Sequence, residues 1–439
     1  MSGSGKEVAL RYDRGRVSVH VPEHAEVLEA AGASAVADAE GAVLTALRSP
    51  IGCDALVSIA RQKKPERVVV TISDITRPVP NEPILKGILA ELAAAGVTED
   101  RVTVLVATGM HRPSTEEERV IMLGADLASR LSVVDHVSSD PEQLVRISED
   151  PPVGINKLYL EADLKIVTGL IEPHFMAGYS GGRKGICPGL VDLATISRFH
   201  GFQTMADPRS AEGVMDGNPC HDEALRVARI VGCDFLVNCA IDESRKLAGV
   251  YAGDLEAAHE VGCEQVAGWN SVEVTQAYDL VISNGGGYPL DESFYQTIKG
   301  IVMALPALHE GSRLVVASKC TEVGSAPFAE LVHRYDGDWR GFLAAIEATD
   351  EIIKDQWSFH MQTRVLALIG QERLMLASDG LPVSEQQRWS VTPVSGEGSV
   401  ADRLQAEIDR FVSDRPDGRI GVIPEGPYTM LRAAEPALA

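Results

Sequence analysis

Short apolar runs, each ending in a polar or glycine-rich turn, divide the first part of the chain. Between these runs, apolar residues recur every three or four positions, as on the buried face of a helix. Strands that alternate with such helices predict βαβ units and a parallel sheet. The expected strands are 67–72, 101–107, 131–134, 164–170 and 235–240, and the expected helices are 82–95 (capped by Asn81), 115–123 and 220–231.

Three other stretches of this part have weaker or different patterns. Residues 8–21 alternate apolar and polar side chains around a turn at 13–15, which predicts a pair of strands. The stretch 25–48 is expected to be loosely helical, and 248–266 is expected to be a connecting helix.

A similar pattern restarts after a break near 268–271. A strand is expected at 278–283, followed by a glycine turn at 284–289 and a helix at 293–305 with Asp291 as its N-cap. The N-terminus of such a helix favours an anion. Further strands are expected at 313–317, 365–369, 374–377 and 420–423.

The break divides the chain into two predicted domains, residues 1–270 and residues 271–439. The predicted fold class is α/β, with two α/β domains that contain mainly parallel sheets. Ligands of α/β proteins bind at sheet edges and between domains. We therefore expect the active site in the cleft between the two domains.

Polar side chains directly follow three of the expected strands. Asp74 and Arg77 follow the first strand, His111 follows the second, and His174 follows the strand at 164–170. Because ligands bind outside the carboxyl ends of strands in open sheets, these side chains are expected around one crevice. Singly, Asp74 has an alternative interpretation as a helix cap, and His111 as a hydrogen-bonded loop residue. Their common place at one edge favours a functional site.

A glycine-rich stretch, EPHFMAGYSGGRKGICPG at 172–189, follows the last of these strands. Glycines allow a backbone to approach a ligand closely and to present N–H groups to it. Lys184 lies within this loop, and His200 closes the largely apolar segment after it. The loop is not a phosphate-binding P-loop, because glycine follows the lysine. Two interpretations stay open: a cofactor site, and a tight surface turn with solvated Arg183 and Lys184.

Composition narrows the classes of partner. The chain of 439 residues has a formal net charge of −23, which argues against nucleic acid or an anionic membrane as its main partner. An anionic substrate would therefore need a locally basic pocket. The seven cysteines include no CxxC pair, so neither a disulfide framework nor a zinc ribbon is expected. No apolar targeting segment or membrane-length run occurs, and we expect a cytoplasmic protein.

Six segments in order give the chain a resemblance to a known family. They are SDITRPVPN at 73–81, ATGMHRPST at 107–115, EPHFMAGYSGGRKGICPG at 172–189, GGGYPLD at 285–291, FYQTIKG at 294–300 and DQW at 355–357. With these segments the chain resembles the lactate racemases that depend on a nickel-pincer cofactor, a family of 2-hydroxyacid racemases and epimerases. The likeness is collinear over most of the chain.

The resemblance implies a role for each candidate residue. Lys184 would carry the cofactor, a pyridinium-3,5-bisthiocarboxylic acid mononucleotide, through a covalent bond, and His200 would bind its nickel. An imidazole ligand suits nickel. His111 and His174 would be the catalytic acid/bases. The turn Asp74, Ile75, Thr76 and Arg77 would contact the cofactor, and Tyr295, Gln296, Lys299 and Trp357 would bind the substrate.

The implied reaction is racemisation of a 2-hydroxyacid, lactate or another short-chain acid, by hydride transfer to and from the cofactor. Each enantiomer presents its hydroxyl group differently, so two histidines are needed, and histidine titrates near neutral pH. The segments 318–328 and 358–360 depart from the family pattern, so a larger or more polar 2-hydroxyacid is the alternative. The expected partners are this substrate and the proteins that make the cofactor, and the expected assembly is a monomer or homodimer.

Two other classes of function compete with this one. The first is a metal-dependent hydrolase or lyase with His111, His174 and His200 as direct ligands. Against it, the chain has no HExxH spacing and no carboxylate-rich ligand set. The second is a non-catalytic protein that binds the cofactor without turnover. The presence of both histidines and of Lys299 argues against this second alternative.

Overall fold

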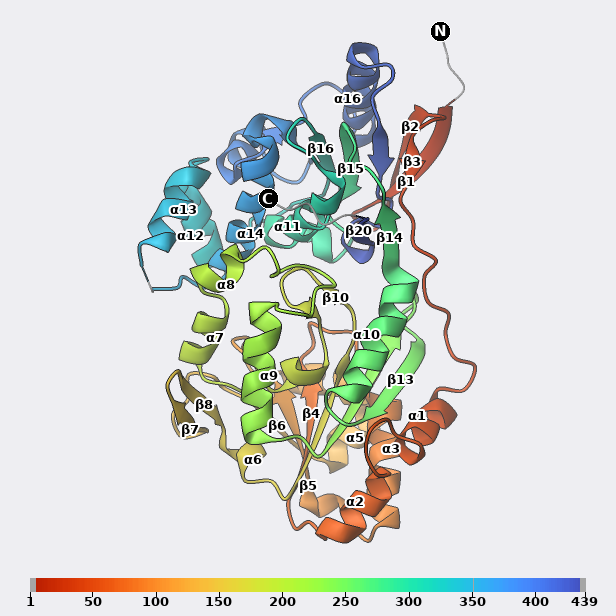
Figure 1. The fold of residues 1–439 in the computed structure, drawn as a ribbon, viewed down its shortest axis with the longest axis vertical. Helices are drawn as coiled ribbons and strands as arrows, with labels where there is room; N and C mark the ends of the chain where they lie inside the picture. The colour runs from red at the N-terminus through yellow and green to blue at the C-terminus, as the bar shows by residue number, and fades with distance from the viewer. Residues whose placement is uncertain (1–4, 350, 435–439) are drawn as a thin grey trace. The chain divides into compact units, whose positions relative to one another are not determined.

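The computed structural model describes residues 5–349 and 351–434, which divide into two α/β units (Figure 1). The first unit contains the described residues of Gly32–His200 and Arg209–Trp269. The second unit contains the described residues of Met1–Ala31, Gly201–Pro208 and Asn270–Ala439. Each unit is built around a six-stranded sheet, so the predicted class of two α/β domains with mainly parallel sheets is confirmed.

The sheet of the first unit has the strand order β13-β12-β9-β4-β5-β6. Every neighbouring pair is parallel except β12 with β13. The strands are β4 (Val68–Ser73), β5 (Val102–Ala107), β6 (Ser132–Asp135), β9 (Leu164–Leu170), β12 (Phe235–Ile241) and β13 (Leu247–Gly253). The prediction of a helix over 248–266 was wrong in its first half, because that segment turns back and pairs with β12 as an antiparallel edge strand.

Helices cover both faces of this sheet. α3 (Asn81–Ala94) packs with α1 (Ala39–Arg48) and α2 (Leu56–Lys63) on one face, and Figure 1 shows α9 (Pro219–Val231) and α10 (Ala257–Asn270) in front of the other. The shorter elements of this unit are η1 (Glu99–Arg101), α4 (Glu116–Leu123), α5 (Ala125–Arg130), β7 (Leu144–Glu149), β8 (Pro152–Asn156), α6 (Lys157–Leu160), β10 (Pro173–His174), β11 (Gly178–Tyr179), η2 (Gly182–Gly185) and α7 (Leu193–Phe199).

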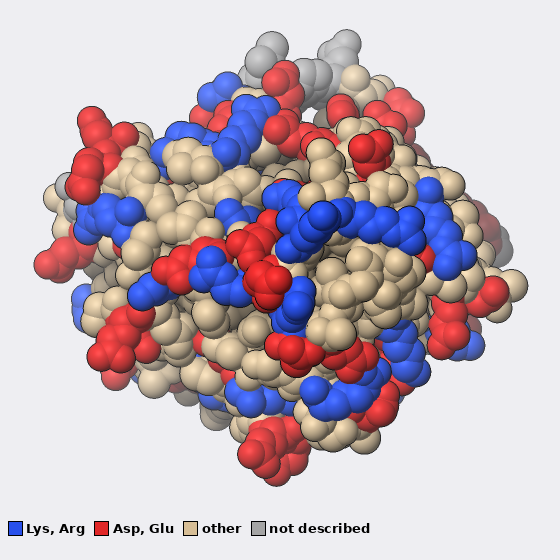
Figure 2. Space-filling view, turned by 90° about the horizontal axis from the view of Figure 1, so that it is seen from below, with Lys and Arg blue, Asp and Glu red and all other residues tan. Residues whose placement is uncertain are grey.

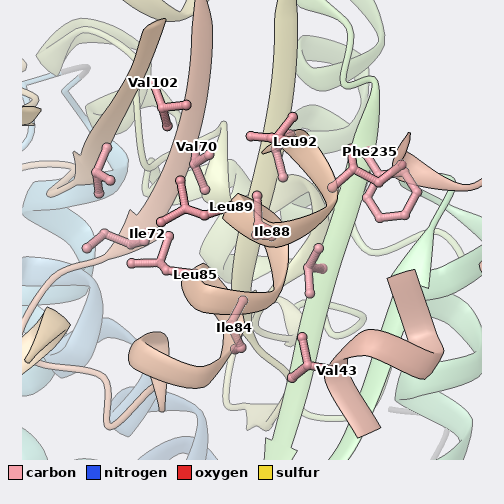
Figure 3. Packing of buried hydrophobic residues seen from close by; sticks show 14 of the residues in the cluster. Val43, Val70, Ile72, Ile84, Leu85, Ile88, Leu89, Leu92, Val102 and Phe235 are labelled. Atoms are coloured by element: carbon pink, nitrogen blue, oxygen red, sulfur yellow. The ribbon is translucent and has the colours of Figure 1, made fainter. Parts of the chain in front are cut away.

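The core of the first unit lies between α3 and the sheet (Figure 3). Ile84, Ile88 and Leu92 are spaced four residues apart, so they share the helix face that meets the strands. The side chains of Val70 and Ile72 rise from β4 to meet them. Burial of this apolar surface is the main force that holds α3 on the sheet.

Replacing Ile88 by alanine is expected to destabilise the first unit by about 2–5 kcal/mol, because the fully buried side chain leaves a cavity. Urea unfolding followed by far-ultraviolet circular dichroism measures this as a lower midpoint. Ile121→Ala is the matched control, since Ile121 lies on α4 with 71% of its surface exposed. Equal midpoints for the two variants would contradict this assignment of the core.

The sheet of the second unit is parallel throughout, with the strand order β18-β17-β16-β15-β19-β3. Its strands are β3 (Glu26–Val27), β15 (Leu280–Asn284), β16 (Arg313–Ala317), β17 (Leu374–Ala377), β18 (Thr392–Pro393) and β19 (Ile420–Val422). The strand predicted at 365–369 was wrong. That apolar run is the last part of α14 (Gln356–Ile369), a helix that is buried on almost every side and therefore shows little periodicity.

The first residues of the chain belong to the second unit, although the predicted boundary placed them in the domain 1–270. The predicted strand pair is confirmed as the antiparallel hairpin of β1 (Gly5–Tyr12) and β2 (Gly15–Pro22). Its apolar face joins the core beside β15 and β16, because an isolated hairpin has no core of its own. β3 then extends the second sheet next to β19. Of the loosely helical stretch 25–48, only the segment of α1 is helical.

Two predicted helix caps were wrong. Asn81 lies inside α3, where Pro80 holds the N-cap position. Asp291 lies in η3 (Leu290–Glu292), and Ser293 caps α11 (Phe294–Val302). The remaining elements of the second unit are α8 (Phe202–Ala206), β14 (Ser271–Val274), η4 (Leu305–Ala307), α12 (Ala326–Tyr335), α13 (Trp339–Glu347), η5 (Gln371–Arg373), α15 (Val383–Gln386), η6 (Gln387–Trp389), α16 (Val400–Asp414), η7 (Gly426–Tyr428) and β20 (Met430–Ala433).

Charged side chains of both signs are interspersed on the face drawn in Figure 2. The first unit has exposed or half-exposed ion pairs such as Arg67 with Glu161 and Lys63 with Asp234. Exposed pairs of this kind contribute little to stability. Within 5–349 and 351–434, no helix is both long enough and apolar enough to cross a membrane.

Candidate active site

The carboxyl ends of β4, β5 and β9 come together at one edge of the first sheet. The sheet order places β4 between the other two strands. Arg77, after β4, forms an ion pair of 3.1 Å with Glu172, after β9. The amide of Gly109, after β5, donates to the carbonyl of Gly189 at 3.0 Å. The three strand-end segments of the sequence analysis are therefore joined by direct contacts.

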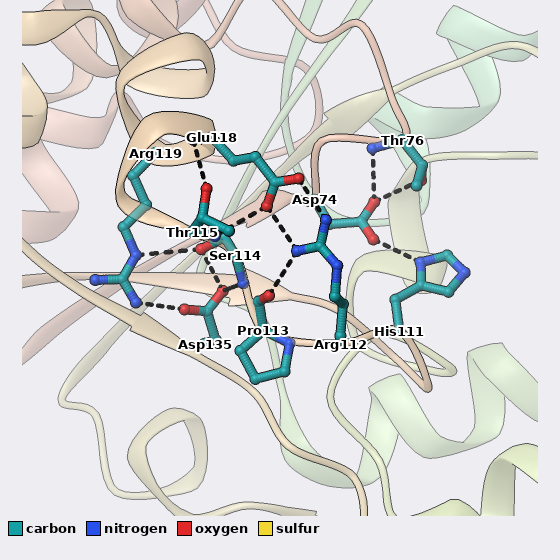
Figure 4. Close-up of polar contacts among 10 residues, drawn as sticks. All are labelled: Asp74, Thr76, His111, Arg112, Pro113, Ser114, Thr115, Glu118, Arg119 and Asp135. Atoms are coloured by element: carbon teal, nitrogen blue, oxygen red, sulfur yellow. Dashed lines mark hydrogen bonds and ion pairs between the residues drawn. The ribbon is translucent and has the colours of Figure 1, made fainter. Parts of the chain in front are cut away.

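His111 is held by a carboxylate. Its Nδ1 lies 2.5 Å from Oδ2 of Asp74, while the other oxygen of Asp74 accepts from the amide and hydroxyl of Thr76 (Figure 4). Burial alone would raise the pKa of Asp74, but the hydrogen bonds from His111 and Thr76 outweigh it and hold the pKa below its usual range. Because an ionised carboxylate only accepts, Nδ1 of His111 carries the proton and Nε2 carries the lone pair. About half of the His111 side chain is exposed.

The segment after His111 is fixed by a second set of polar contacts (Figure 4). Arg112 forms a bidentate ion pair with Glu118, at 2.6 and 2.8 Å. Thr115 and Glu118 cap the start of α4 reciprocally. Ser114 donates to Asp135 at the end of β6. The loop that carries His111 is therefore anchored on the side away from Asp74.

His174 has the opposite hydrogen-bonding pattern. It lies in the short strand β10, which pairs with β11 to form a tight hairpin. Its Nδ1 accepts from the backbone amides of Met176 and Ala177, at 3.4 and 3.3 Å. A ring nitrogen that accepts cannot carry the proton, so neutral His174 holds its proton on Nε2. The ring also stacks on Phe175, with centroids 5.3 Å apart.

Two glycines of the loop pack closely against the protein itself. A Cβ on Gly178 would lie 2.3 Å from the carbonyl oxygen of Val214, and one on Gly182 would lie 2.6 Å from the ring of His259. Both glycines have a positive φ. The amide of Gly182 donates to buried Asn238 on β12 at 2.8 Å. These close approaches fix the backbone just before Lys184, and a Cβ on Gly185, just after it, would lie 2.7 Å from Cγ1 of Val167.

Lys184 projects from the short helix η2 of this loop. Its Nζ lies 5.3 Å from the centre of the Phe199 ring. Burial, reinforced by the positive charge of neighbouring Arg183, lowers the pKa of Lys184 to about 7. A large fraction of its amine is therefore uncharged at neutral pH and can act as a nucleophile.

His200 is the C-cap of α7 and is buried, with 8% of its surface exposed. Its Nδ1 lies 2.8 Å from the carbonyl of Ile196. Because a carbonyl only accepts, Nδ1–H donates and Nε2 carries the lone pair that a metal needs. Burial lowers the pKa of His200 to about 3, and the charge of Lys184 contributes, so the ring is neutral.

The predicted substrate-binding residues lie in the second unit, on two helices that pack together. Tyr295, Gln296 and Lys299 are on α11, and Trp357 is in the first turn of α14. The carbonyl of Tyr295 accepts from the hydroxyl of Ser358, which joins the two helices. Oε1 of Gln296 is buried without a hydrogen-bond partner, as is typical of a group that binds a ligand.

Three polar contacts in the part of the candidate site on the first unit were not predicted. No sequence pattern indicates that Asp74 binds His111, that Glu172 pairs with Arg77, or that Asn238 holds the glycine loop. The only signal for Asn238 is its polar side chain within the apolar strand β12. In the part of the chain that the structure describes, no three His, Cys, Asp or Glu side chains gather as a metal-ligand set. Direct coordination by three histidines therefore has no support.

Comparisons with known proteins find one family for this chain. Residues 12–213 match the lactate racemase N-terminal domain, and residues 272–426 match the lactate racemase C-terminal domain. The lactate racemase of Lactiplantibacillus plantarum is 38% identical over 326 residues, which cover 73% of this chain and 76% of that protein. The lactate racemase of Thermoanaerobacterium thermosaccharolyticum is 32% identical over 407 residues, 90% of each chain.

Solved structures extend the likeness to the fold. The lactate racemase apoprotein from Thermoanaerobacterium thermosaccharolyticum superimposes with a TM-score of 0.87 at 30% identity, covering 97% of this chain and 100% of that one. A Thermotoga maritima protein, 16% identical with a TM-score of 0.64, shares the fold over 90% of this chain and 98% of its own. Since both domain models and two relatives match over most of its length, the chain belongs to the lactate racemase family.

Proposed function

We propose that the protein is an isomerase that racemises a 2-hydroxy carboxylic acid with the nickel-pincer mononucleotide. The observation that carries the proposal is the pair of histidines, His111 and His174, at the sheet edge that also holds Lys184. The family relationship supports the same reaction class.

The chemistry explains why such a cofactor is needed. The C2 hydrogen of a 2-hydroxy carboxylate is not acidic, because the neighbouring carboxylate is already negative. Simple deprotonation by a histidine is therefore too difficult. When bound, the cofactor would supply the group that takes the C2 hydrogen with its electron pair and returns it to either face of the planar 2-keto acid.

The residues of the first unit have the chemistry to hold this group. Lys184 offers an amine with a pKa of about 7, which suits covalent attachment through a thioamide. His200 offers a neutral imidazole whose Nε2 carries the lone pair, and nickel accepts imidazole ligands. A cofactor that brings its own sulfur and carbon donors needs only this single protein ligand. The turn from Asp74 to Arg77 would contact the mononucleotide.

His111 and His174 would exchange the proton of the hydroxyl group. Nε2 of His111 carries a lone pair, and the ionised Asp74 stabilises the imidazolium that forms when it takes a proton. Nε2 of His174 carries a proton that it can donate. One histidine removes the hydroxyl proton from one enantiomer, and the other histidine returns a proton to form the opposite enantiomer.

The second unit would supply substrate recognition. Lys299 would neutralise the substrate carboxylate, and the amide of Gln296 would bind the carboxylate or hydroxyl group. Tyr295 and Trp357 would form the apolar walls beside the C2 substituent. Fixing the carboxylate leaves only the hydroxyl group and the C2 hydrogen free to exchange partners. Lactate or another short-chain acid is the proposed substrate, and the departures at 318–328 and 358–360 leave a larger acid as the alternative.

The test uses protein expressed together with the cofactor-making proteins. Intact-mass measurement detects the adduct, and chiral chromatography follows single-enantiomer lactate and a panel of larger 2-hydroxyacids. We expect an adduct on Lys184 and racemisation of at least one acid, with a trapped 2-keto acid during turnover. An adduct without racemisation of any acid would show a cofactor-binding protein, and turnover without an adduct would point to a different chemistry.

A further inference from the structure

The glycine turn after β15 does not form an open ligand cradle. In parallel α/β sheets ligands bind outside the carboxyl ends of the strands, and β15 lies near the middle of this sheet, between β16 and β19. In this structure the turn of the β1–β2 hairpin lies against the carboxyl end of β15. The amide of Tyr288 donates to the carbonyl of Asp13 at 2.7 Å. A Cβ on Gly287 would lie 3.3 Å from both that oxygen and Cβ of Arg11, so the third glycine leaves room for the hairpin.

Several polar contacts fasten the hairpin to this edge. Arg11 and Arg16 both form ion pairs with Glu425, after β19. The hydroxyl of Tyr12 donates to Asp379, which also pairs with a lysine at 3.0 Å. The guanidinium of Arg14 lies 3.6 Å above the centre of the Tyr288 ring.

One of these contacts reaches the start of the helix that carries the predicted substrate-binding residues. Oδ2 of Asp291 accepts from the backbone amide of Asp13 at 2.6 Å. Asp291 is fully buried, and its carbonyl accepts from the amide of Cys320 at 2.7 Å. Burial raises the pKa of Asp291, and the hydrogen bond from Asp13 opposes that rise. Removal of the carboxyl group would take away the acceptor of the Asp13 amide and leave that donor unpaired.

The position of Asp291 in the chain gives this contact a consequence for the site. Ser293, two residues later, caps α11 by accepting from the amide of Gln296 at 3.3 Å. Gln296 therefore lies in the first turn of α11, and Lys299 lies one turn further on the same helix. The clamp formed by the turn of the β1–β2 hairpin and Asp291 thus fixes the N-terminal end of α11, which carries Gln296 in its first turn and Lys299 in its last turn.

We propose that Asp291, held by the amide of Asp13, is a positioning residue for substrate binding. It acts through α11, setting where Gln296 and Lys299 place their side chains. The proposal rests on the proposed function for the roles of these two residues. In this proposal the β1–β2 hairpin contributes to substrate affinity as well as to stability.

The experiment compares three variants of the cofactor-loaded protein. Asp291→Ala removes the acceptor, and Asp291→Asn keeps an acceptor oxygen. Glu407→Ala is the control, because it removes another buried carboxylate of the same unit, on α16, which is far along the chain from α11. We expect Asp291→Ala to raise KM on the order of tenfold or more with a smaller change in kcat, because lost ground-state positioning appears in KM. Asp291→Asn should restore KM to within about threefold, and Glu407→Ala should lower the melting temperature without changing KM.

Hydrogen exchange of α11 in the cofactor-free protein separates this inference from the proposed function. Faster exchange at Phe294–Val302 in Asp291→Ala, but not in Glu407→Ala, supports the clamp even if the wild-type protein racemises nothing. Wild-type KM in Asp291→Ala would overturn the inference while leaving the racemase proposal intact. Equal changes of KM and exchange in Asp291→Ala and Glu407→Ala would also overturn it, because they would show general destabilisation only.

Discussion

Replacement of Lys184 by alanine is expected to abolish the covalent adduct and with it racemisation. The reason is that Lys184 combines a pKa lowered to about 7 with a backbone fixed on both sides by close-packed glycines. Intact-mass measurement after expression with the cofactor-making proteins reports the adduct directly. Activity should fall to the level of the uncatalysed reaction, because a loosely held cofactor would lack its orientation.

Lys165→Ala is the matched control for this variant. Burial also lowers the pKa of Lys165, but this lysine lies on β9 and donates to the carbonyl of Val231, outside the glycine loop. It should keep the adduct, which would show that a lowered pKa alone does not define the attachment site. A normal adduct mass in Lys184→Ala would contradict the assignment.

His200→Ala completes this comparison by separating the metal from the organic group. The variant should keep the adduct on Lys184 and lose nickel, which elemental analysis measures. The expectation follows from Nε2 of His200, which carries a lone pair because Nδ1 donates to the carbonyl of Ile196. If the nickel content of His200→Ala equals that of the wild-type protein, His200 is not the nickel ligand and is only a buried histidine at a helix end.

Local patterns allowed most of the first sheet to be predicted. β4, β5 and β9 are short runs of apolar, largely β-branched residues, and each ends at the polar residues that the structure brings together. Parallel strands that are buried on both faces produce such continuous runs, so their identity depends little on distant parts of the chain. The positions of Asp74, His111 and His174 at one edge followed from this pattern.

The errors arose where distant contacts decide the structure. β13 is an edge strand because it pairs with β12, and nothing within its own residues distinguishes it from a helix. The end of α14 is apolar on all sides, so its composition is that of a buried strand. The hairpin was recognised, but its place in the second unit depends on contacts with residues hundreds of positions away, such as Glu425.

The candidate site was also predicted only in part. Motifs indicated the candidate residues, but not which of their atoms face one another. The carboxylate of Asp74 on His111 and the two amides on His174 depend on backbone geometry that the sequence does not display. Close packing within the protein and close approach to a ligand select the same residue, so the sequence did not indicate which protein groups each glycine would meet.

These hydrogen bonds predict that the two proposed catalytic histidines are unequal. Nε2 of His111 is ready to accept a proton, because Nδ1–H donates to the ionised Asp74. For His174 to accept at Nε2, its proton must move to Nδ1, which faces the amides of Met176 and Ala177. The enantiomer whose hydroxyl group faces His111 should therefore form keto acid faster in a single turnover. Steady-state kcat/KM cannot show this difference, because the equilibrium constant between enantiomers is unity.

Three variants test this inequality in single-turnover formation of bound keto acid from each pure enantiomer. His111→Ala should slow the faster enantiomer by about 10²–10⁴-fold and His174→Ala should slow the other by a similar factor, as expected for the loss of a general base. Asp74→Asn keeps the hydrogen bond but removes the charge that stabilises protonated His111, so it should slow the faster enantiomer selectively. If both alanine variants slow both enantiomers equally, or if one is unimpaired, the two-base arrangement is wrong. One histidine would then position the cofactor without exchanging the hydroxyl proton.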